Sequence, residues 1–195
     1  MASTGGTCNG ASGFPCSAQG PGKKANPMAF NVREIFKALS DAAVDYVVVG
    51  GFAVILHGYL RATADLDLVI GLAPDNCIRS LEALKRIGFQ PRLPVGIEEF
   101  ADSSNRNEWS QQRNMLVFPL WDPDNPVRSV DIFLNEPIPI ETLMRDSVAK
   151  DVDGCVVRVA SIEHLIEMKQ AAGRPRDLDD IAKLRLIREE GAEYG

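Results

Sequence analysis

Apolar residues in the first third of the chain follow first the spacing of a helix and then that of a buried strand. From residue 32 to about residue 43 they recur every three or four positions, which predicts an amphipathic helix. Residues 46–49, Tyr-Val-Val-Val, are apolar at every position, as a central strand with both faces buried requires. This run ends at Gly50-Gly51, and residues 52–57 are predicted to form a second helix.

The middle of the chain repeats this order of strand and helix before the pattern weakens. Residues 65–70 predict a second strand, and residues 75–87 predict an amphipathic helix that is closed by Gly88. From residue 90 to residue 113 the sequence is polar and poorly periodic, so we expect a loop with room for one short element.

The last part of the chain predicts a hairpin followed by further helices and a strand. Two strand-like runs, at 114–120 and 128–133, flank a turn-rich segment. The later elements are a helix near 140–147, a strand at 155–159, a helix at 161–172 and a final helix after Pro175. We therefore expect an α/β (α+β) fold, a mixed sheet flanked by helices, with a short helical C-terminal part at about 160–190.

Composition is that of an ordinary folded protein with one core. The chain has 195 residues, of which 45% are hydrophobic and 25% are charged. Residues 1–27 are dominated by Gly, Ser, Ala, Thr and Pro, which predicts a disordered tail before a single domain at 28–195. No apolar run approaches the roughly 18 residues that span a bilayer, and the start lacks the pattern of a signal peptide, so we expect a cytoplasmic protein without a membrane partner.

Charge and cysteine content narrow the range of partners. The formal net charge of −6 provides no polybasic field for holding a long nucleic acid non-specifically. The four cysteines lack the paired spacing of a zinc site, and the chain has only two histidines. Small substrates or short contacts therefore fit the sequence better than a long nucleic acid.

Three aspartates are candidates for a metal site. Side chains alternate along a strand, so Asp65 and Asp67 project to one face while the leucines between and after them enter the core. Two neighbouring carboxylates favour a bound divalent cation, with magnesium the natural match, although a merely polar strand face has the same pattern. On the later strand, Asp131 shares a face with Ser129 and Phe133, and three acidic groups can hold two metals.

Gly50-Gly51 is a candidate phosphate site. It lies where a buried strand passes into a helix, so unhindered backbone N–H groups can face an anion there. A tight strand-to-helix turn requires glycine for its own reasons, which is the simpler interpretation of the pair alone. The order of strand, glycine pair, helix and Asp-x-Asp strand, with Asp131 on a later strand, is much less common than any of its parts.

These residues resemble those of a known family. The segments 49–53, 57, 61–63 and 65–67 resemble the DNA polymerase beta superfamily of nucleotidyltransferases, and the segment 169–180 resembles its AbiEii-type toxin members and their bacterial relatives. The resemblance covers roughly residues 30–186. It implies a minimal nucleotidyltransferase fold.

The resemblance also assigns roles. It implies that Gly50 and Gly51 hold the triphosphate and that the aspartates bind two magnesium ions, with manganese as an alternative. It further implies that Asp131 helps to deprotonate the attacking hydroxyl. The residues that bind the metal would be Asp65, Asp67 and Asp131.

Five further positions are candidate nucleotide contacts: Arg61, Thr63, Lys169, Arg174 and Asp177. Lys169 lies within the apolar stripe of its helix, from which its ammonium group either reaches water or points into a phosphate pocket. The resemblance favours the pocket, and it places Arg174 and Asp177 at the same site, with a looser role for Asp180. Arg61 is expected to meet the triphosphate, or else to lie in solvent, and the Thr63 hydroxyl is expected to bond the nearby carboxylates.

The function expected from these features is transfer of a nucleoside monophosphate from a nucleoside triphosphate to a hydroxyl, with release of pyrophosphate. An RNA end, a protein hydroxyl and a small molecule are all open as the acceptor. The family resemblance adds a toxin–antitoxin system and a cognate antitoxin protein. The alternative is a catalytically silent module that binds nucleotide or an antitoxin partner.

Overall fold

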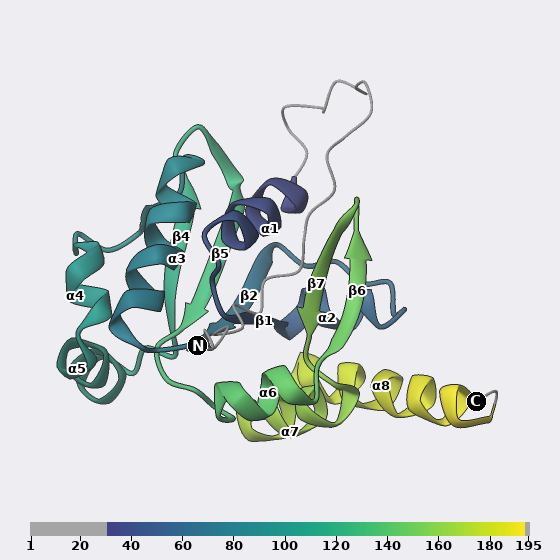
Figure 1. Ribbon diagram of the computed structural model, residues 1–195. Coiled ribbons are helices and arrows are strands. Elements are labelled where there is room, and N and C mark those ends of the chain that lie inside the picture. The colour runs from purple at the N-terminus through teal and green to yellow at the C-terminus, as the bar shows by residue number, and fades with distance from the viewer. Residues whose placement is uncertain (1–30, 194–195) are drawn as a thin grey trace, which may run out of the picture.

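The computed structural model describes residues 31–193 of the chain (Figure 1). The tail predicted for residues 1–27 lies outside the described residues. Within them, strands and helices form one mixed sheet with helices packed around it, so the predicted mixed α/β class is confirmed.

The centre of the molecule is a seven-stranded sheet in the order β3-β4-β5-β2-β1-β7-β6. Its strands are β1 Tyr46–Val49, β2 Asp65–Ile70, β3 Gln90–Pro91, β4 Val117–Asp122, β5 Asn125–Phe133, β6 Val148–Val152 and β7 Cys155–Val159. β2 runs antiparallel to β1 on one side and parallel to β5 on the other, and this parallel pair carries the acidic residues.

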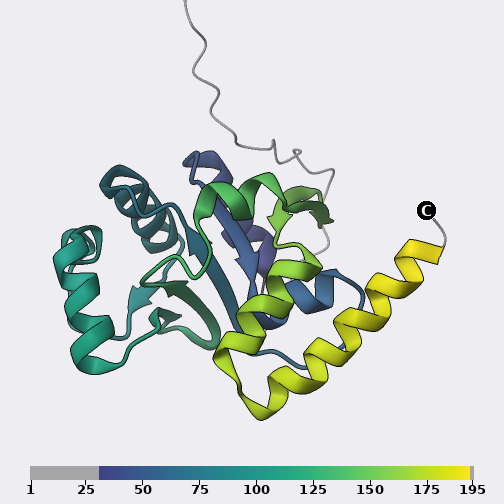
Figure 2. The ribbon, with the colours of Figure 1, turned by 90° about the horizontal axis from the view of Figure 1, so that it is seen from below.

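Eight helices are described around the sheet. They are α1 Val32–Asp41, α2 Gly50–Leu56, α3 Pro74–Arg86, α4 Ile97–Ala101, α5 Ser103–Arg113, α6 Ile140–Arg145, α7 Ile162–Ala172 and α8 Pro175–Glu193. α1 and α3 pack on each other, while α6, α7 and α8 gather at the lower edge of Figure 1. Seen from below, α7 meets α8 at a sharp corner, and the end of α8 leaves the body of the molecule (Figure 2). None of the helices described is long and apolar enough to cross a membrane.

The core explains why the acidic strand forms where it does. All four residues of β1 are buried, as its apolar run predicts. In β2, Leu66 and Leu68 are fully buried while Asp65 and Asp67 remain partly exposed, so the strand is anchored by one face and offers carboxylates on the other. The hairpin of β4 and β5 buries Val130 and Ile132 in the same way.

The prediction for residues 90–113 is wrong. This stretch contains β3 and two helices, α4 and α5, instead of a loop with one short element. α5 is polar on most of its surface and buries only Arg106 and Trp109, so it carries little of the apolar periodicity that reveals a helix. The Asp102 carboxylate begins the helix by accepting from the Ser104 N–H at 2.8 Å.

β6 was also not predicted. It lies at the edge of the sheet, pairs only with β7, and exposes most of its side chains, so its sequence lacks the apolar signature of a buried strand.

Candidate active site

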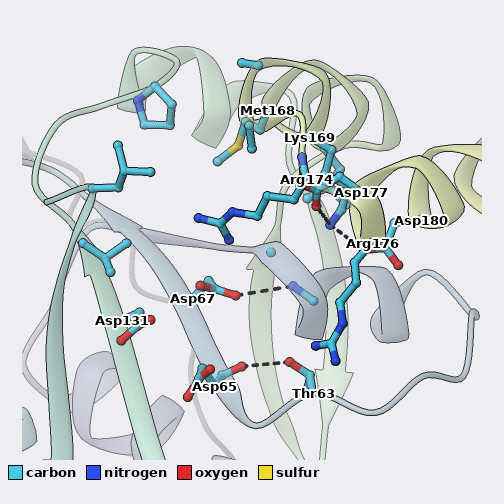
Figure 3. Close-up of a pocket in the computed structure, with 18 of the residues that line it drawn as sticks. Thr63, Asp65, Asp67, Asp131, Met168, Lys169, Arg174, Arg176, Asp177 and Asp180 are labelled. Atoms are coloured by element: carbon cyan, nitrogen blue, oxygen red, sulfur yellow. Dashed lines mark hydrogen bonds and ion pairs between the residues drawn. The ribbon is translucent and has the colours of Figure 1, made fainter. Parts of the chain in front are cut away.

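A cavity of about 850 Å³ opens beside the partly exposed face of β2 and β5. The loop between α2 and β2 forms one wall, and the corner where α7 meets α8 forms another. Every residue that the sequence predicts for the site lines this cavity: Gly50, Gly51, Arg61, Thr63, Asp65, Asp67, Asp131, Lys169, Arg174 and Asp177. Residues more than a hundred positions apart are thereby brought to one place, as Figure 3 shows.

The strand register places the carboxylates. β2 and β5 are parallel neighbours in which Asp67 is opposite Asp131 and Asp65 is opposite Ser129. Asp67 and Asp131 therefore project side by side from adjacent strands. Asp65 accepts a hydrogen bond from the Ser129 hydroxyl, which holds its carboxylate next to the pair.

The charges of this group oppose one another. Burial raises the pKa of Asp67 from 3.8 to about 6, and repulsion from Asp131 adds to the rise, against a hydrogen bond from the Gly51 N–H. Burial also raises the pKa of Asp131 to about 6. Repulsion from Asp65 adds to this rise, and the charges of Arg92 and Arg174 act against it. At neutral pH the site therefore holds carboxylates that are costly to ionise.

A divalent cation fits this donor set because it would offset the repulsion between hard oxygen ligands. No group of three or more His, Cys, Asp or Glu side chains between residues 31 and 193 is gathered closely enough to hold a metal as it stands. Asp65 is engaged by Ser129, and Asp67 accepts from the Gly51 N–H at 3.4 Å. Small side-chain rotations would be needed to bring the carboxylates onto one ion.

The two glycines leave room for the side chains that pack against them. Gly50 has a positive φ of 65°, and a Cβ there would lie 2.0 Å from Oδ2 of Asp67. A Cβ on Gly51 would lie 2.8 Å from Oγ1 of Thr63 and 3.2 Å from Cζ of Arg61. The pair therefore lets Asp67 and the α2–β2 loop pack directly onto the start of α2.

Thr63 does not make the contact expected of it. Its hydroxyl lies 3.3 Å from the main-chain carbonyl of Asp65, to which it donates, and no hydrogen bond to a carboxylate is described for it. The threonine fixes the start of β2 instead of touching the acidic side chains.

Lys169 lines the cavity, but its ammonium group is already paired with two carboxylates of α8. It is only 7% exposed, so its stem does not carry the ammonium group to water. The ammonium donates to Oδ2 of Asp180 at 2.6 Å and lies 3.4 Å from Oδ1 of Asp177. Asp180, itself 2% exposed, also accepts from Arg61. One buried carboxylate thus joins two cations that were expected at the triphosphate.

The corner between α7 and α8 is held by the same acids. The second oxygen of Asp177 accepts from the Arg174 N–H at 3.2 Å, which fixes the start of α8. Tyr59 donates its hydroxyl to Asp179 at 2.9 Å and ties α8 to the α2–β2 loop. The sequence analysis assigns no role to Tyr59 or Asp179. The acidic run at 177–180 is a signal for Asp179, and the sequence offers none for Tyr59.

Apart from Glu167 and Arg176, the rest of the cavity wall is apolar. It comes from the ends of β4 and β5, the segment before α6, and α7, and includes Leu116, Val117, Phe133, Pro137, Ile138, Leu165 and Met168. The cavity is therefore polar beside the aspartates and the α7–α8 corner, and apolar beyond them.

Two solved structures of the antibiotic-resistance factor ANT(2'')-Ia are similar to this chain. One is its solution structure, with a TM-score of 0.50 at 13% identity over 84% of this chain and 90% of that one. The other, in complex with adenylyl-2''-tobramycin, also has a TM-score of 0.50, at 15% identity over 84% of this chain and 97% of that one. The chain has the nucleotidyltransferase fold.

A nucleotidyltransferase-like protein from Paracoccidioides brasiliensis is also similar, with a TM-score of 0.48 at 20% identity over 78% of this chain and 73% of that one. No protein-family model matches the chain, and no curated protein matches it in sequence. At these identities the likeness concerns the nucleotidyltransferase fold, and what the site does rests on its own residues.

Proposed function

We propose that this protein transfers a nucleoside monophosphate from a nucleoside triphosphate to a hydroxyl acceptor and releases pyrophosphate. The observation that carries the proposal is the pairing of Asp67 with Asp131 across adjacent parallel strands, inside a cavity whose other wall holds lysine and arginine. Such a cavity offers carboxylate ligands for cations on one side and hydrogen-bond donors for phosphate oxygens on the other.

Asp65, Asp67 and Asp131 are the residues that would hold magnesium, as two ions or with manganese in its place. Bound there, the metal would neutralise the triphosphate and favour ionisation of the attacking hydroxyl. The repulsion among these carboxylates supports this assignment, because a cation would relieve it.

The chain itself supplies positioning and proton transfer. We assign Asp131 to accept the proton of the acceptor hydroxyl, because it is the less buried of the two opposed carboxylates and has the apolar wall beyond it. The backbone at Gly50 and Gly51 opens onto the cavity and is assigned to the phosphates, with Arg174 and Lys169 on the facing side. Positioning of this kind accounts for most of the catalysis in phosphoryl and nucleotidyl transfer.

The acceptor is proposed only as a hydroxyl compound, which is an RNA end, a protein side chain or a small molecule. The ANT(2'')-Ia structure holds an adenylylated aminoglycoside, which makes small molecules the first class to test. Membership in a toxin–antitoxin system, with a cognate antitoxin, is a proposal that rests on the resemblance of the segment 169–180 alone.

The test is label transfer. The protein is incubated with each α-³²P-labelled nucleoside triphosphate and magnesium, together with total RNA, a protein extract or an aminoglycoside set, and the products are separated. We expect one acceptor pool to become labelled, and Asp67→Asn to remove the label while Asp75→Asn, an exposed aspartate on α3, keeps it. If the wild type binds triphosphates but labels none of these pools, the silent binding module is the better description. If it binds no triphosphate, the proposal is wrong.

A further inference from the structure

The cations of the cavity fall into two groups. Lys169 and Arg61 are already matched by carboxylates, since both donate to the buried Asp180 and Lys169 also lies next to Asp177. A cation whose charge is compensated by a buried acid attracts an incoming anion less than a free one does. These two residues therefore cannot be the whole of a triphosphate site.

The second group consists of two arginines at the α7–α8 corner. Arg174 and Arg176 both line the cavity and are exposed. Among residues 31–193, no carboxylate is described within ion-pair distance of either guanidinium. In Figure 3 both side chains start at the corner where α7 meets α8 and extend from it toward the part of the sheet that carries the three aspartates. Arg174 was expected here from the sequence, whereas Arg176 was not.

The place of Arg176 in its helix is unfavourable for helix stability. α8 begins at Pro175, so Arg176 is the second residue of a 19-residue helix. The N-terminus of a helix carries a partial positive charge and favours acidic side chains, and Asp177 meets that preference whereas Arg176 opposes it. Neither an ion pair nor the helix explains an arginine at this position, but a bound anion in the cavity does.

We propose that Arg176 is a further nucleotide-binding residue that contacts the phosphate chain of the triphosphate. The inference rests on the proposed function, because it uses the same cavity. In this arrangement Asp177 and Asp180 hold Lys169 and Arg61 in place at the cavity wall, while Arg174 and Arg176, for which no ion pair is described among residues 31–193, supply charge for the phosphates. Bidentate N–H groups of a guanidinium suit phosphate oxygens, so lysine is expected to replace Arg176 only in part.

The test compares Arg176→Met with a matched change on the same helix. Arg185 is exposed on α8 and does not line the cavity, so Arg185→Met removes the same charge from the same helix without touching the site. Affinities for ATP and adenosine are measured by calorimetry with magnesium present. For ATP we expect Arg176→Met to weaken binding by about tenfold or more and Arg176→Lys by less, while Arg185→Met stays near wild type. For adenosine, which has no phosphate, the three variants should agree with wild type.

The outcomes separate the two proposals. If the wild type binds ATP and Arg176→Met binds it equally well, Arg176 is not a phosphate contact and the proposed function is untouched. Equal losses for ATP and adenosine would assign Arg176 to the shape of the cavity instead of to phosphate, which also overturns the inference. If the wild type shows no affinity for any nucleoside triphosphate, the proposed function fails first.

Discussion

Asp67 and Asp131 show how a strand register creates a chemical site from two ordinary residues. Each carboxylate follows the simple alternation of its own strand, yet the parallel pairing of β2 with β5 sets them opposite each other. Burial is the main cause of their raised pKa values, and repulsion from Asp131 adds to that of Asp67 while repulsion from Asp65 adds to that of Asp131. Asp131 is the more accessible of the two, which is why we assign it to the proton and Asp67 to the centre of the metal site.

Replacing Asp131 with asparagine should separate chemistry from binding. If Asp131 accepts the proton of the acceptor, Asp131→Asn should lower kcat by roughly 10²- to 10⁴-fold while the affinity for the triphosphate changes much less. Asp67→Asn should reduce both. Steady-state transfer and equilibrium nucleotide binding measure the two effects, and a similar loss of affinity in both variants would remove the special role of Asp131.

Gly50 offers a second test at the level of one residue. Gly50→Ala places a Cβ 2.0 Å from Oδ2 of Asp67 and also strains a positive φ. Gly154→Ala is the control, because Gly154 has a φ of 82° but no described atom within 4 Å of the added Cβ. In denaturant titration Gly154→Ala should lose about 1–2 kcal/mol of unfolding free energy from the strained backbone, and Gly50→Ala should lose more because its Cβ also clashes with Asp67. Only Gly50→Ala should also lose transfer activity, and an active Gly50→Ala would mean that Asp67 can move without cost.

At the scale of elements, α7 and α8 act as one unit through Lys169. Its partners lie eight and eleven residues later, on the next helix, and they bury its ammonium group between the two helices. Removing one member of a buried ion pair leaves the other charge without compensation. The ion pairs therefore contribute to the corner that forms the cavity wall, in addition to any contact with substrate.

Lys169→Met should lower both stability and nucleotide affinity. The side chain keeps its packing, but Asp177 and Asp180 lose their shared cation, which should cost about 3 kcal/mol in unfolding free energy, with Arg61 still compensating Asp180 in part. Lys85→Met, on the exposed face of α3, is the matched control and should be near neutral. A Lys169→Met protein as stable as wild type would show that the pair is not retained in solution.

The sequence predicts elements well where burial is regular and poorly where polar residues are recruited into the interior. The strands β1, β2, β5 and β7 follow from apolar runs or clean alternation, and the aspartates follow from the same alternation. Helix α5 is not predicted from the sequence because one of its two buried residues is Arg106. This arginine donates to main-chain carbonyls of α4, and apolar periodicity does not reveal such a contact. The ion pair between Lys169 and Asp180 is not predicted either, because it depends on the angle between α7 and α8.

At the scale of the whole molecule, the acidic site should make stability depend on pH and on metal. In the unfolded chain Asp67 and Asp131 titrate near 3.8, whereas in the folded protein the pKa of each is about 6. Folded pKa values above the unfolded ones mean that the two groups favour folding fully only below pH 4, and that this contribution is lost as pH rises through 6.

The comparison is between wild type and an Asp67→Asn/Asp131→Asn double variant in EDTA. The two melting temperatures should be closest near pH 4. As the pH rises to 7.5, the melting temperature of the variant should exceed that of wild type by an increasing margin. Magnesium should raise the melting temperature of wild type at pH 7.5 and leave that of the variant unchanged, because the cation would offset the carboxylate charges that only wild type has. Parallel pH curves for the two proteins would contradict the raised pKa values of Asp67 and Asp131.

The bonds that tie the α2–β2 loop to α8 also bear on the order in which the molecule assembles. Arg61 reaches Asp180 across 119 positions, and Tyr59 reaches Asp179 across 120. Contacts of such long separation close large loops and tend to form after local structure. A chain emerging from the ribosome can therefore pair β1 with β2 well before the cavity exists, and it gains the cationic wall only after residues 169–176 have been made.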